Sequence, residues 1–240
     1  MSLQRRFDLA LGDVDAVAAV HDGVLLTYAD LADWQSVLEQ AWAWLDDSEA
    51  ERIRRKRIAS DAGTTLLAYA LLRWSAGRVL GMRPEEVPVW RDENRCPRVG
   101  SGEVHVSLSH ADGRALACVS TMGPVGGDIE PLSRCAAIAD IGERVCHPDE
   151  WKTMTGLDAA VRNRALLELW VRKEALLKAA GIGLAREMDS FPAPAGMPLS
   201  LMPDAAGCAC IEMLDLGEGW LGAVAAPVAA TVRMVPMLPG

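Results

Sequence analysis

The sequence lacks several features that would assign it to a functional class directly. It carries no excess of basic side chains, because 33 acidic residues outnumber 24 lysines and arginines and give a formal net charge of −9. A general nucleic-acid-binding surface is therefore not expected. No apolar run approaches the length needed to cross a bilayer, and Asp8, Asp13 and Asp15 interrupt any signal-peptide core. We expect a cytoplasmic protein that binds neither nucleic acid nor membrane.

Paired cysteines are also missing. The six cysteines show no C-x-x-C spacing, and Cys208 with Cys210 has no second pair to complete a metal site. Free, mostly buried thiols in a reducing compartment are the interpretation that we favour. Hydrophobic residues, in contrast, make up 50% of the 240 residues, which is enough for a sizeable core. A chain of this length can form one large domain or two small ones packed together.

The predicted elements mix helices and strands without regular βαβ alternation, which indicates an α+β fold. A helix is expected to begin at Ser48, because Glu51 completes the spacing of a capping box. A core helix follows from Thr65 and ends at Gly81. The other expected elements are a short hairpin over 14–28, loop with short extended pieces over 82–103, strands over 104–109, 115–119 and 125–129, helices over 138–145 and 160–180, and further strands over 200–237.

The third of these strands carries two acidic residues. Residues 126–130 read G-G-D-I-E, and residues two apart on a strand face the same side, so Asp128 and Glu130 would project together. Two adjacent carboxylates repel each other unless a positive group lies between them. A hard divalent cation such as Mg²⁺ suits them, because it prefers a few carboxylates together with phosphate oxygens and water. The alternative is an acidic strand end that faces water.

The last predicted helix carries a polar stripe. Residues 170–178 read W-V-R-K-E-A-L-L-K, and Trp170, Glu174 and Lys178 lie four apart on one face of the helix. An ordinary Glu–Lys pair beside a partly buried tryptophan explains this spacing. The functional alternative makes Glu174 a third carboxylate and Lys178 a phosphate contact.

A serine and a histidine close the strand that reads V-S-L-S-H over 106–110. The hydroxyl of Ser109 and the imidazole of His110 are donors suited to phosphate oxygens. A hydrolase pair is the other interpretation, but no G-x-S-x-G elbow surrounds the serine, and adjacent strand residues point apart.

Taken in order, the Ser-His pair, G-x-D-I-E and W-x-x-K-E-x-x-x-K-x-x-G-x-G-L resemble the Sfp-type 4′-phosphopantetheinyl transferases. The resemblance is clearest over 107–191 and weaker over 49–73. It implies a pseudo-dimeric fold of two similar α+β halves, which we expect at 1–115 and 116–240, with coenzyme A bound between them. It also implies a monomeric, magnesium-dependent enzyme of the holo-[acyl-carrier-protein] synthase type. Such an enzyme moves the 4′-phosphopantetheine arm of coenzyme A to a serine of an acyl- or peptidyl-carrier protein and releases adenosine 3′,5′-bisphosphate.

The same resemblance implies roles for the motif residues. Asp128, Glu130 and Glu174 are similar to the family's Mg²⁺ carboxylates, and Glu174 is our choice for the base that accepts the proton of the carrier serine. Lys178 looks like the lysine that reaches the pyrophosphate. The pair described above, Ser109 with His110, looks like one that holds coenzyme A.

The nucleotide end of coenzyme A is expected to contact the first half. Thr65 falls where the family contacts this end, and Arg52 aligns with basic residues that grip the 3′-phosphate. Residues 52–57 contain five basic side chains, for which a solvated helix face is the other interpretation.

Three departures from the family pattern concern this nucleotide end. Cys96 stands where the family usually has lysine or arginine before a proline, so Arg95 or Arg98 is the expected substitute. Glu49 and Thr64 also occupy positions where basic residues are common. These departures motivate one alternative, a homologue that binds coenzyme A or a carrier protein without transfer. A metal-dependent phosphodiesterase that uses the same acids to activate water is the other.

Overall fold

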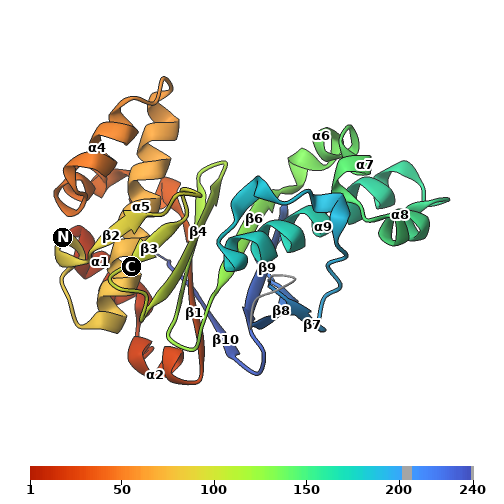
Figure 1. Cartoon of the computed structure of the whole chain (residues 1–240). Coiled ribbons are helices and arrows are strands. Elements are labelled where there is room, and N and C mark those ends of the chain that lie inside the picture. The colour runs from red at the N-terminus through yellow and green to blue at the C-terminus, as the bar shows by residue number, and fades with distance from the viewer. Residues whose placement is uncertain (202–206, 239–240) are drawn as a thin grey trace.

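A computed structural model describes residues 1–201 and 207–238 of the protein. Two halves, each with a four-stranded sheet and a 22-residue helix packed on it, lie side by side (Figure 1). The first sheet has the strand order β10-β1-β5-β4 and is covered by α5, and the second has the order β6-β9-β8-β7 and is covered by α9. The predicted α+β fold of two similar halves is confirmed.

The elements have the following bounds: α1 Leu3–Leu11, α2 Ala16–His21, β1 Gly23–Asp30, η1 Leu31–Val37, α3 Leu38–Ala41, η2 Trp42–Trp44, α4 Asp47–Arg54, α5 Ala59–Leu80, η3 Pro84–Glu86, β2 Val89–Arg91, β3 Pro97–Val99, β4 His105–Ala111, β5 Arg114–Ser120, β6 Gly126–Pro131, η4 Leu132–Arg134, α6 Cys135–Ala139, α7 Gly142–Val145, α8 Pro148–Met154, α9 Ala159–Ala180, η5 Gly183–Ala185, η6 Met188–Ser190, β7 Pro198–Ser200, β8 Cys208–Met213, β9 Trp220–Pro227 and β10 Thr231–Pro236.

The predicted hairpin over 14–28 is wrong, because its first arm is the helix α2. The carboxylate of Asp15 accepts the N–H groups of Val17 and Ala18 and so caps the start of this helix. Only the second arm is extended, as the start of β1. That strand pairs with β5 in antiparallel fashion and with β10 in parallel fashion.

The start of α4 was expected at Ser48 with Glu51, but the capping box uses the residues two positions earlier. Asp46 accepts the N–H of Glu49, and the Glu49 carboxylate accepts the N–H of Asp46. Both registers satisfy the spacing rule. The observed one buries Ile53 completely and turns Glu49 toward the buried Arg73.

The long helices agree best with the sequence pattern. Helix α9 matches the prediction over 160–180 and ends at Gly181, whose φ of 69° is the left-handed conformation typical of a helix end. Helix α5 ends at Gly81 as expected but begins at Ala59, ahead of Thr65. The helix expected over 138–145 is two short helices, α6 and α7.

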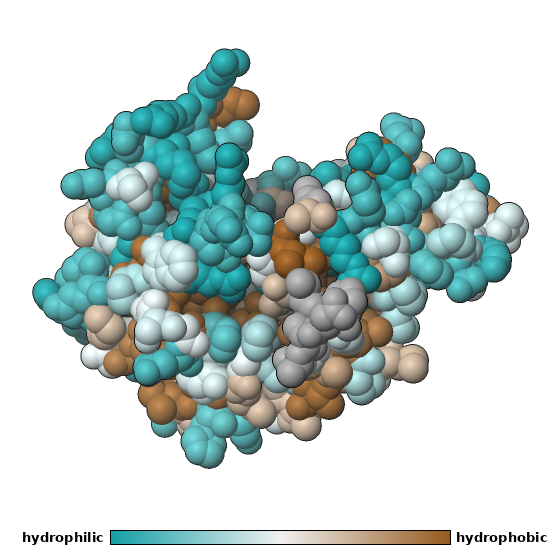
Figure 2. All heavy atoms as spheres, viewed as in Figure 1, coloured by the Kyte–Doolittle hydropathy of each residue, from teal (hydrophilic) through white to brown (hydrophobic). Residues whose placement is uncertain are grey.

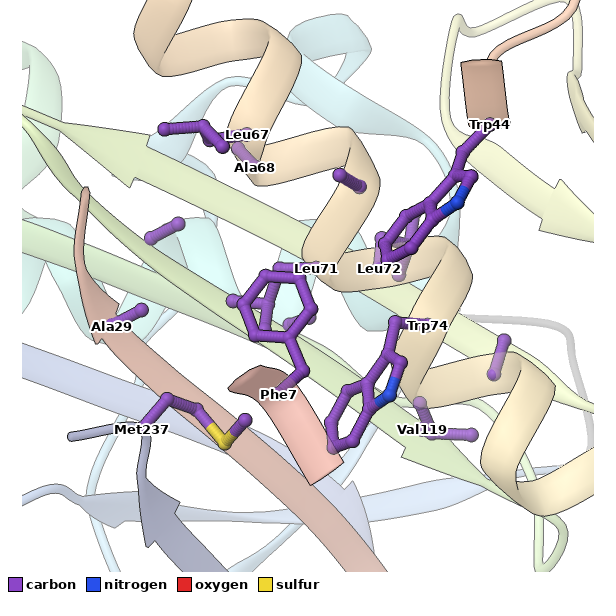
Figure 3. Packing of buried hydrophobic residues seen from close by; sticks show 14 of the residues in the cluster. Phe7, Ala29, Trp44, Leu67, Ala68, Leu71, Leu72, Trp74, Val119 and Met237 are labelled. Carbon is purple, nitrogen blue, oxygen red and sulfur yellow. The ribbon is translucent and has the colours of Figure 1, made fainter. Parts of the chain in front are cut away.

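Helix α1, which no clear pattern predicted, packs through aromatic residues. The ring of Phe7 lies 4.4 Å from the ring of Trp34 and 5.3 Å from that of Trp74, measured between centroids. Figure 3 shows Phe7 against Leu71 and Trp74 of α5. Such ring pairs contribute about 0.5–1.5 kcal/mol each beyond the area that they bury.

The two sheets meet face to face in a core of their own. Alternate residues of β1 divide between two sides: Leu25 packs toward α5, whereas Val24 and Leu26 point to the second sheet. Each sheet is therefore buried on both faces, by its helix and by the other sheet. The buried residues between the sheets are Val24, Leu26, Tyr28, Leu116, Cys118, Val125, Ile129, Leu216, Val224 and Ala226.

Sheet membership places the change from the first half to the second after Ser120. The expected boundary between residues 115 and 116 lies inside β5, which pairs with β1 and β4 of the first sheet. The chain then enters the second sheet with β6 and returns to the first with its last strand, β10. The division into two domains stays a prediction.

The six cysteines are free thiols, as expected. Of these, Cys118 and Cys146 are buried and Cys208 is exposed, so fewer are buried than predicted. Within the described parts of the chain, no helix is long and apolar enough to cross a membrane.

Candidate active site

Strand β6 packs closely against α9 on one face and β5 on the other, because a glycine leaves room on each side. A Cβ atom on Gly126 would lie 2.0 Å from the carbonyl oxygen of Ala175, and one on Gly127 would lie 2.5 Å from the Sγ atom of Cys118 on the opposite face. Real Cβ contacts are never this short, so glycine is required at both positions. The G-G-D-I-E sequence thereby brings the residues that follow the glycines next to α9.

The two acids of β6 are buried and incompletely paired. Asp128 and Glu130 are 5% and 7% exposed. One oxygen of each is paired: Asp128 Oδ1 accepts from Lys178 Nζ at 2.6 Å, and Glu130 Oε1 pairs with the guanidinium of Arg134. The other oxygens, Asp128 Oδ2 and Glu130 Oε2, are buried without a hydrogen-bond partner. Buried acceptors of this kind are costly unless something occupies the space beside them.

Helix α9 supplies the opposite wall of the site. Glu174 and Lys178 line one cleft together with Asp128, Glu130 and Trp170. The remaining lining residues are Leu108, Ser109, His110 and Ile129. The structure therefore brings the three acids and the lysine, which come from distant segments, into one cleft. Their roles stay a prediction.

The charges in this cleft interact strongly. Burial, followed by the neighbouring Asp128 carboxylate, raises the pKa of Glu130 to about 7. Burial also raises the pKa of the Glu174 carboxyl above its ordinary value; Lys178 opposes this shift and Asp128 adds to it. Asp128 thus raises the pKa of both glutamates, as a carboxylate close to another carboxyl does.

Asp128 and Glu130 fit a small, hard cation. Their two unpartnered oxygens are the donor type that Mg²⁺ prefers, and Glu174 faces the same cleft from α9. Across residues 1–201 and 207–238, no three His, Cys, Asp or Glu side chains are grouped as a ready-made metal site. In this state Lys178 and Arg134 are the counter-charges of the two strand acids.

Ser109 and His110 also lie in the cleft, but their surroundings differ. The Ser109 hydroxyl donates to Asp128 Oδ1 at 2.8 Å and accepts the N–H of Ile129 at 3.3 Å. Burial and the nearby Lys56, Lys178 and Arg52 lower the pKa of His110 to about 4, so its imidazole is neutral near pH 7.

A second pocket adjoins the first and is rich in cations. Arg91, Arg95 and Lys178 line it together with Tyr69, and it shares Leu108, His110, Glu174 and Lys178 with the acid-lined cleft. Figure 2 shows the surface hollowed between the α4–α5 end of the first half and the α6–α9 region of the second. In a protein with a net charge of −9, this local excess of positive charge marks a site for an anion.

Two arginines lie over the ring of Tyr69, and one of them, Arg91, also lines this pocket. The guanidinium carbons of Arg52 and Arg91 lie 4.8 Å and 5.4 Å from the centre of its ring. Arg91 also donates to the Tyr69 hydroxyl and to the carbonyl oxygen of Arg95, whereas Arg52 Nη2 is buried without a partner. Sequence reasoning singled out Arg52 but missed Arg91. The only sequence signal for Arg91 was its position in the segment 82–103, where short extended stretches were expected, a few residues before Cys96.

Comparison with known proteins connects this geometry to a family. The profile of the 4′-phosphopantetheinyl transferase superfamily matches residues 124–216, the segment that contains both acidic motifs. The 4′-phosphopantetheinyl transferase HetI of Nostoc sp. is 26% identical over 215 residues, covering 83% of this chain and 90% of that protein. The 4′-phosphopantetheinyl transferase Sfp of Bacillus subtilis is 25% identical over 203 residues, covering 83% and 89%. Another Bacillus subtilis 4′-phosphopantetheinyl transferase is 28% identical over 154 residues, covering 64% and 67%.

Over both of its halves, the chain is similar to the Sfp-type 4′-phosphopantetheinyl transferases.

Two of the three departures from the family pattern, at Cys96 and Glu49, now have physical explanations. Cys96 stands where the family has a basic residue, and Arg95 and Arg98 were the two expected substitutes. Arg95 lines the cation-rich pocket, whereas Arg98 is held by Asp92 at 2.6 Å. Glu49 is not a nucleotide contact in this arrangement, because its carboxylate is buried against Arg73 at 2.6 Å.

Thr65, like Arg52, is a predicted nucleotide contact that does not line either pocket. It is 1% exposed, and its hydroxyl donates to the carbonyl oxygen of Asp61 one turn earlier in α5. Neither pocket has Thr65 in its lining. Its role toward coenzyme A stays a prediction.

Proposed function

We propose that this protein transfers the 4′-phosphopantetheine moiety of coenzyme A to a serine hydroxyl of an acyl- or peptidyl-carrier protein. The observation that supports this most is the cleft between the halves, where Asp128, Glu130 and Glu174 face Lys178 beside a cation-rich pocket. A pyrophosphate needs cations along its length and a carboxylate-bound metal at its reacting end. The cation-rich pocket supplies the first kind of contact, and the carboxylates of the adjoining cleft would hold the metal for the second.

The transfer forms one bond and breaks one. The carrier serine oxygen bonds to the phosphorus on the pantetheine side of the pyrophosphate, and the bond from that phosphorus to the bridging oxygen breaks. Adenosine 3′,5′-bisphosphate leaves with the electron pair. Glu174 takes the serine proton, directly or through water, and such base assistance accelerates a transfer about 10²–10⁴-fold. A carboxyl whose pKa is raised by burial is better suited to this task than an ordinary glutamate.

Asp128, Glu130 and Glu174 would hold Mg²⁺, with the unpartnered oxygens of the two strand acids as its first ligands. When bound, the metal offsets the negative charge of the pyrophosphate and of the three acids. Lys178 is then free to leave Asp128 and to pair with a phosphate oxygen.

The remaining phosphate contacts come from the first half. Arg91 and Arg95 line the pocket that we assign to the phosphates of coenzyme A, and Arg52 lies over the ring of Tyr69, which lines the same pocket. His110 is neutral as it stands and contributes a hydrogen bond. Planar guanidinium groups suit this role, because they bind phosphate oxygens in pairs.

Within the family, we propose the Sfp type of activity rather than the holo-[acyl-carrier-protein] synthase type expected from the sequence. The relatives named HetI and Sfp each align with 83% of this chain, so both halves take part in the likeness. Acyl- and peptidyl-carrier proteins both remain candidate acceptors.

Intact-mass analysis of apo-carrier proteins incubated with coenzyme A, with and without Mg²⁺, tests the proposal. The expected result is a metal-dependent mass increase equal to one phosphopantetheine arm on the carrier serine. Free phosphopantetheine without carrier modification would instead identify a phosphodiesterase. Binding of coenzyme A without either product would identify a homologue that has lost transfer activity.

A further inference from the structure

The turn that joins β2 to β3 holds an arginine in a backbone conformation that normally suits glycine. Arg95 has a φ of 63°, in the left-handed region that residues with a Cβ atom rarely adopt. Of the three non-glycine residues that the described parts of the chain hold at positive φ, it alone lines the cation-rich pocket. Strain of this kind persists only where the surrounding structure fixes the backbone.

Hydrogen bonds within the turn supply that constraint. The carbonyl oxygen of Asp92 accepts the N–H of Arg95 at 2.9 Å, and its carboxylate Oδ1 accepts the N–H of Cys96 at 2.9 Å. The guanidinium of Arg91 donates to the carbonyl oxygen of Arg95, also at 2.9 Å. Both backbone polar groups of Arg95 are therefore bonded, and a change to negative φ would disturb them.

Asn94 holds the same turn against the second half of the protein. Its side-chain amide donates to the carbonyl oxygen of Gly181 at 2.9 Å, although the two residues are 87 positions apart in the sequence. Gly181 ends α9 shortly after Lys178, and Lys178 lines the same pocket as Arg95. This hydrogen bond therefore fixes the position of Arg95 relative to the lysine.

The Arg95 guanidinium is available to a ligand. Across residues 1–201 and 207–238, no carboxylate forms an ion pair with it, whereas the guanidinium of Arg98 is held by Asp92 at 2.6 Å. In a chain with a net charge of −9, a cation that lines a pocket without an acidic partner is suited to an anion.

We propose that the turn over 92–96 holds Arg95 in a strained conformation and thereby presents its guanidinium to a phosphate of coenzyme A, with Asp92 and Asn94 as positioning residues. This inference rests on the proposed function, which assigns the pocket to the phosphates. It makes stability and coenzyme A affinity opposed at this position, because glycine would relieve the strain and also remove the cation. Cys96 lines the same pocket without a positive φ, so a basic side chain there could supply the charge without the strain.

Arg95→Gly tests this opposition, and Ala229→Gly is its matched control. Ala229 lies in the turn between β9 and β10, has a φ of 70° and lines neither pocket. Both substitutions should raise the melting temperature, by about 2–4 °C. Only Arg95→Gly should weaken coenzyme A binding, by about tenfold or more in calorimetry, because a charged hydrogen bond is lost. Adding Cys96→Lys to Arg95→Gly should restore most of the affinity and keep the higher melting temperature.

Asn94→Ala tests whether the contact with Gly181 acts through Arg95. Alone, it should weaken coenzyme A binding several-fold. In the Arg95→Gly background it should change binding little, because the group that it positions is then absent. An equal loss of affinity in both backgrounds would show that Asn94 does not act through Arg95.

Two further results would overturn the proposal. Unchanged coenzyme A affinity in Arg95→Gly would mean that the guanidinium does not contact the substrate. A lower melting temperature for Arg95→Gly, with a higher one for Ala229→Gly, would mean that the arginine stabilises the turn and is not strained. Failure of the proposed function is distinguishable from both results, because these measurements report binding and melting. A protein that shows the expected order of affinities but modifies no carrier protein would lack the function and keep this assignment.

Discussion

The buried ion pair between Arg73 and Glu49 permits a quantitative test of how the first half is held together. Arg73 donates to Glu49 Oε2 from Nη2 at 2.6 Å and from Nε at 3.0 Å, and to the carbonyl oxygen of Val87 at 2.6 Å. Its side chain is 3% exposed and that of Glu49 is 7% exposed. In Arg73→Met the glutamate loses its counter-charge while it stays buried.

Breaking such a pair from one side costs about 3–5 kcal/mol. The loss is large against the whole stability of a typical domain, which is about 5–15 kcal/mol. Arg164→Met is the control, because Arg164 pairs with Glu168 on the exposed side of α9 at 3.2 Å, and exposed pairs of this spacing contribute about 0.3–0.5 kcal/mol.

Urea unfolding, followed by tryptophan fluorescence, measures both variants. The double variant Glu49→Met with Arg73→Met should recover most of the loss, because neither charge is then left unpaired in the core. Similar midpoints for Arg73→Met and Arg164→Met would refute this reasoning. A Glu49→Lys variant that binds coenzyme A more tightly without loss of stability would also refute it. Residue 49 would then contact the nucleotide and would not hold the fold together.

Two further predictions concern the site itself. Gly126→Ala should destabilise the protein by about 1–3 kcal/mol or more and lower transfer activity, because the added Cβ would lie 2.0 Å from the Ala175 carbonyl oxygen and push β6 off α9. The control is Gly63→Ala within α5, whose added Cβ would have its nearest neighbour at 3.6 Å, and a thermal melt should find this variant neutral or stabilised. Equal effects of the two substitutions on the melting temperature would contradict the packing argument. Arg91→Ala should raise the KM for coenzyme A about tenfold or more, as expected when a charged hydrogen bond is lost. Arg98→Ala should change this KM little, because the Arg98 guanidinium is held by Asp92. Steady-state kinetics that find the reverse order would exclude Arg91 as a phosphate contact.

The sequence predicted best those features that depend on local pattern. The polar stripe on α9 and the end of this helix at Gly181 follow from the spacing of residues alone. The projection of Asp128 and Glu130 from the same side of β6 follows from the two-residue period of a strand. The glycines before them were part of the recognised motif. Their purpose, a close approach to α9 on one face and to β5 on the other, became visible only in three dimensions.

What the sequence could not predict depends on contacts between distant segments. Two capping boxes overlap at residues 46–51, and Arg73, far along the chain, favours the one that buries Glu49. The buried position of Ser107 and Ser109 depends on β6 lying over β4, which no alternation within β4 encodes. Helix α1 is held by the ring of Phe7 against distant tryptophans, so its local pattern gave little signal.

The most direct test of the central claim is the activity of Glu174→Gln, which keeps the size of the side chain but removes the base. Intact-mass assays with an apo-carrier protein, coenzyme A and Mg²⁺ should show transfer reduced by about 10²–10⁴-fold, while calorimetry shows coenzyme A binding within a few-fold of wild type. Glu168→Gln, on the exposed side of the same helix, should transfer normally. Full activity in Glu174→Gln would contradict the account, because the acid of α9 would then have no part in the reaction.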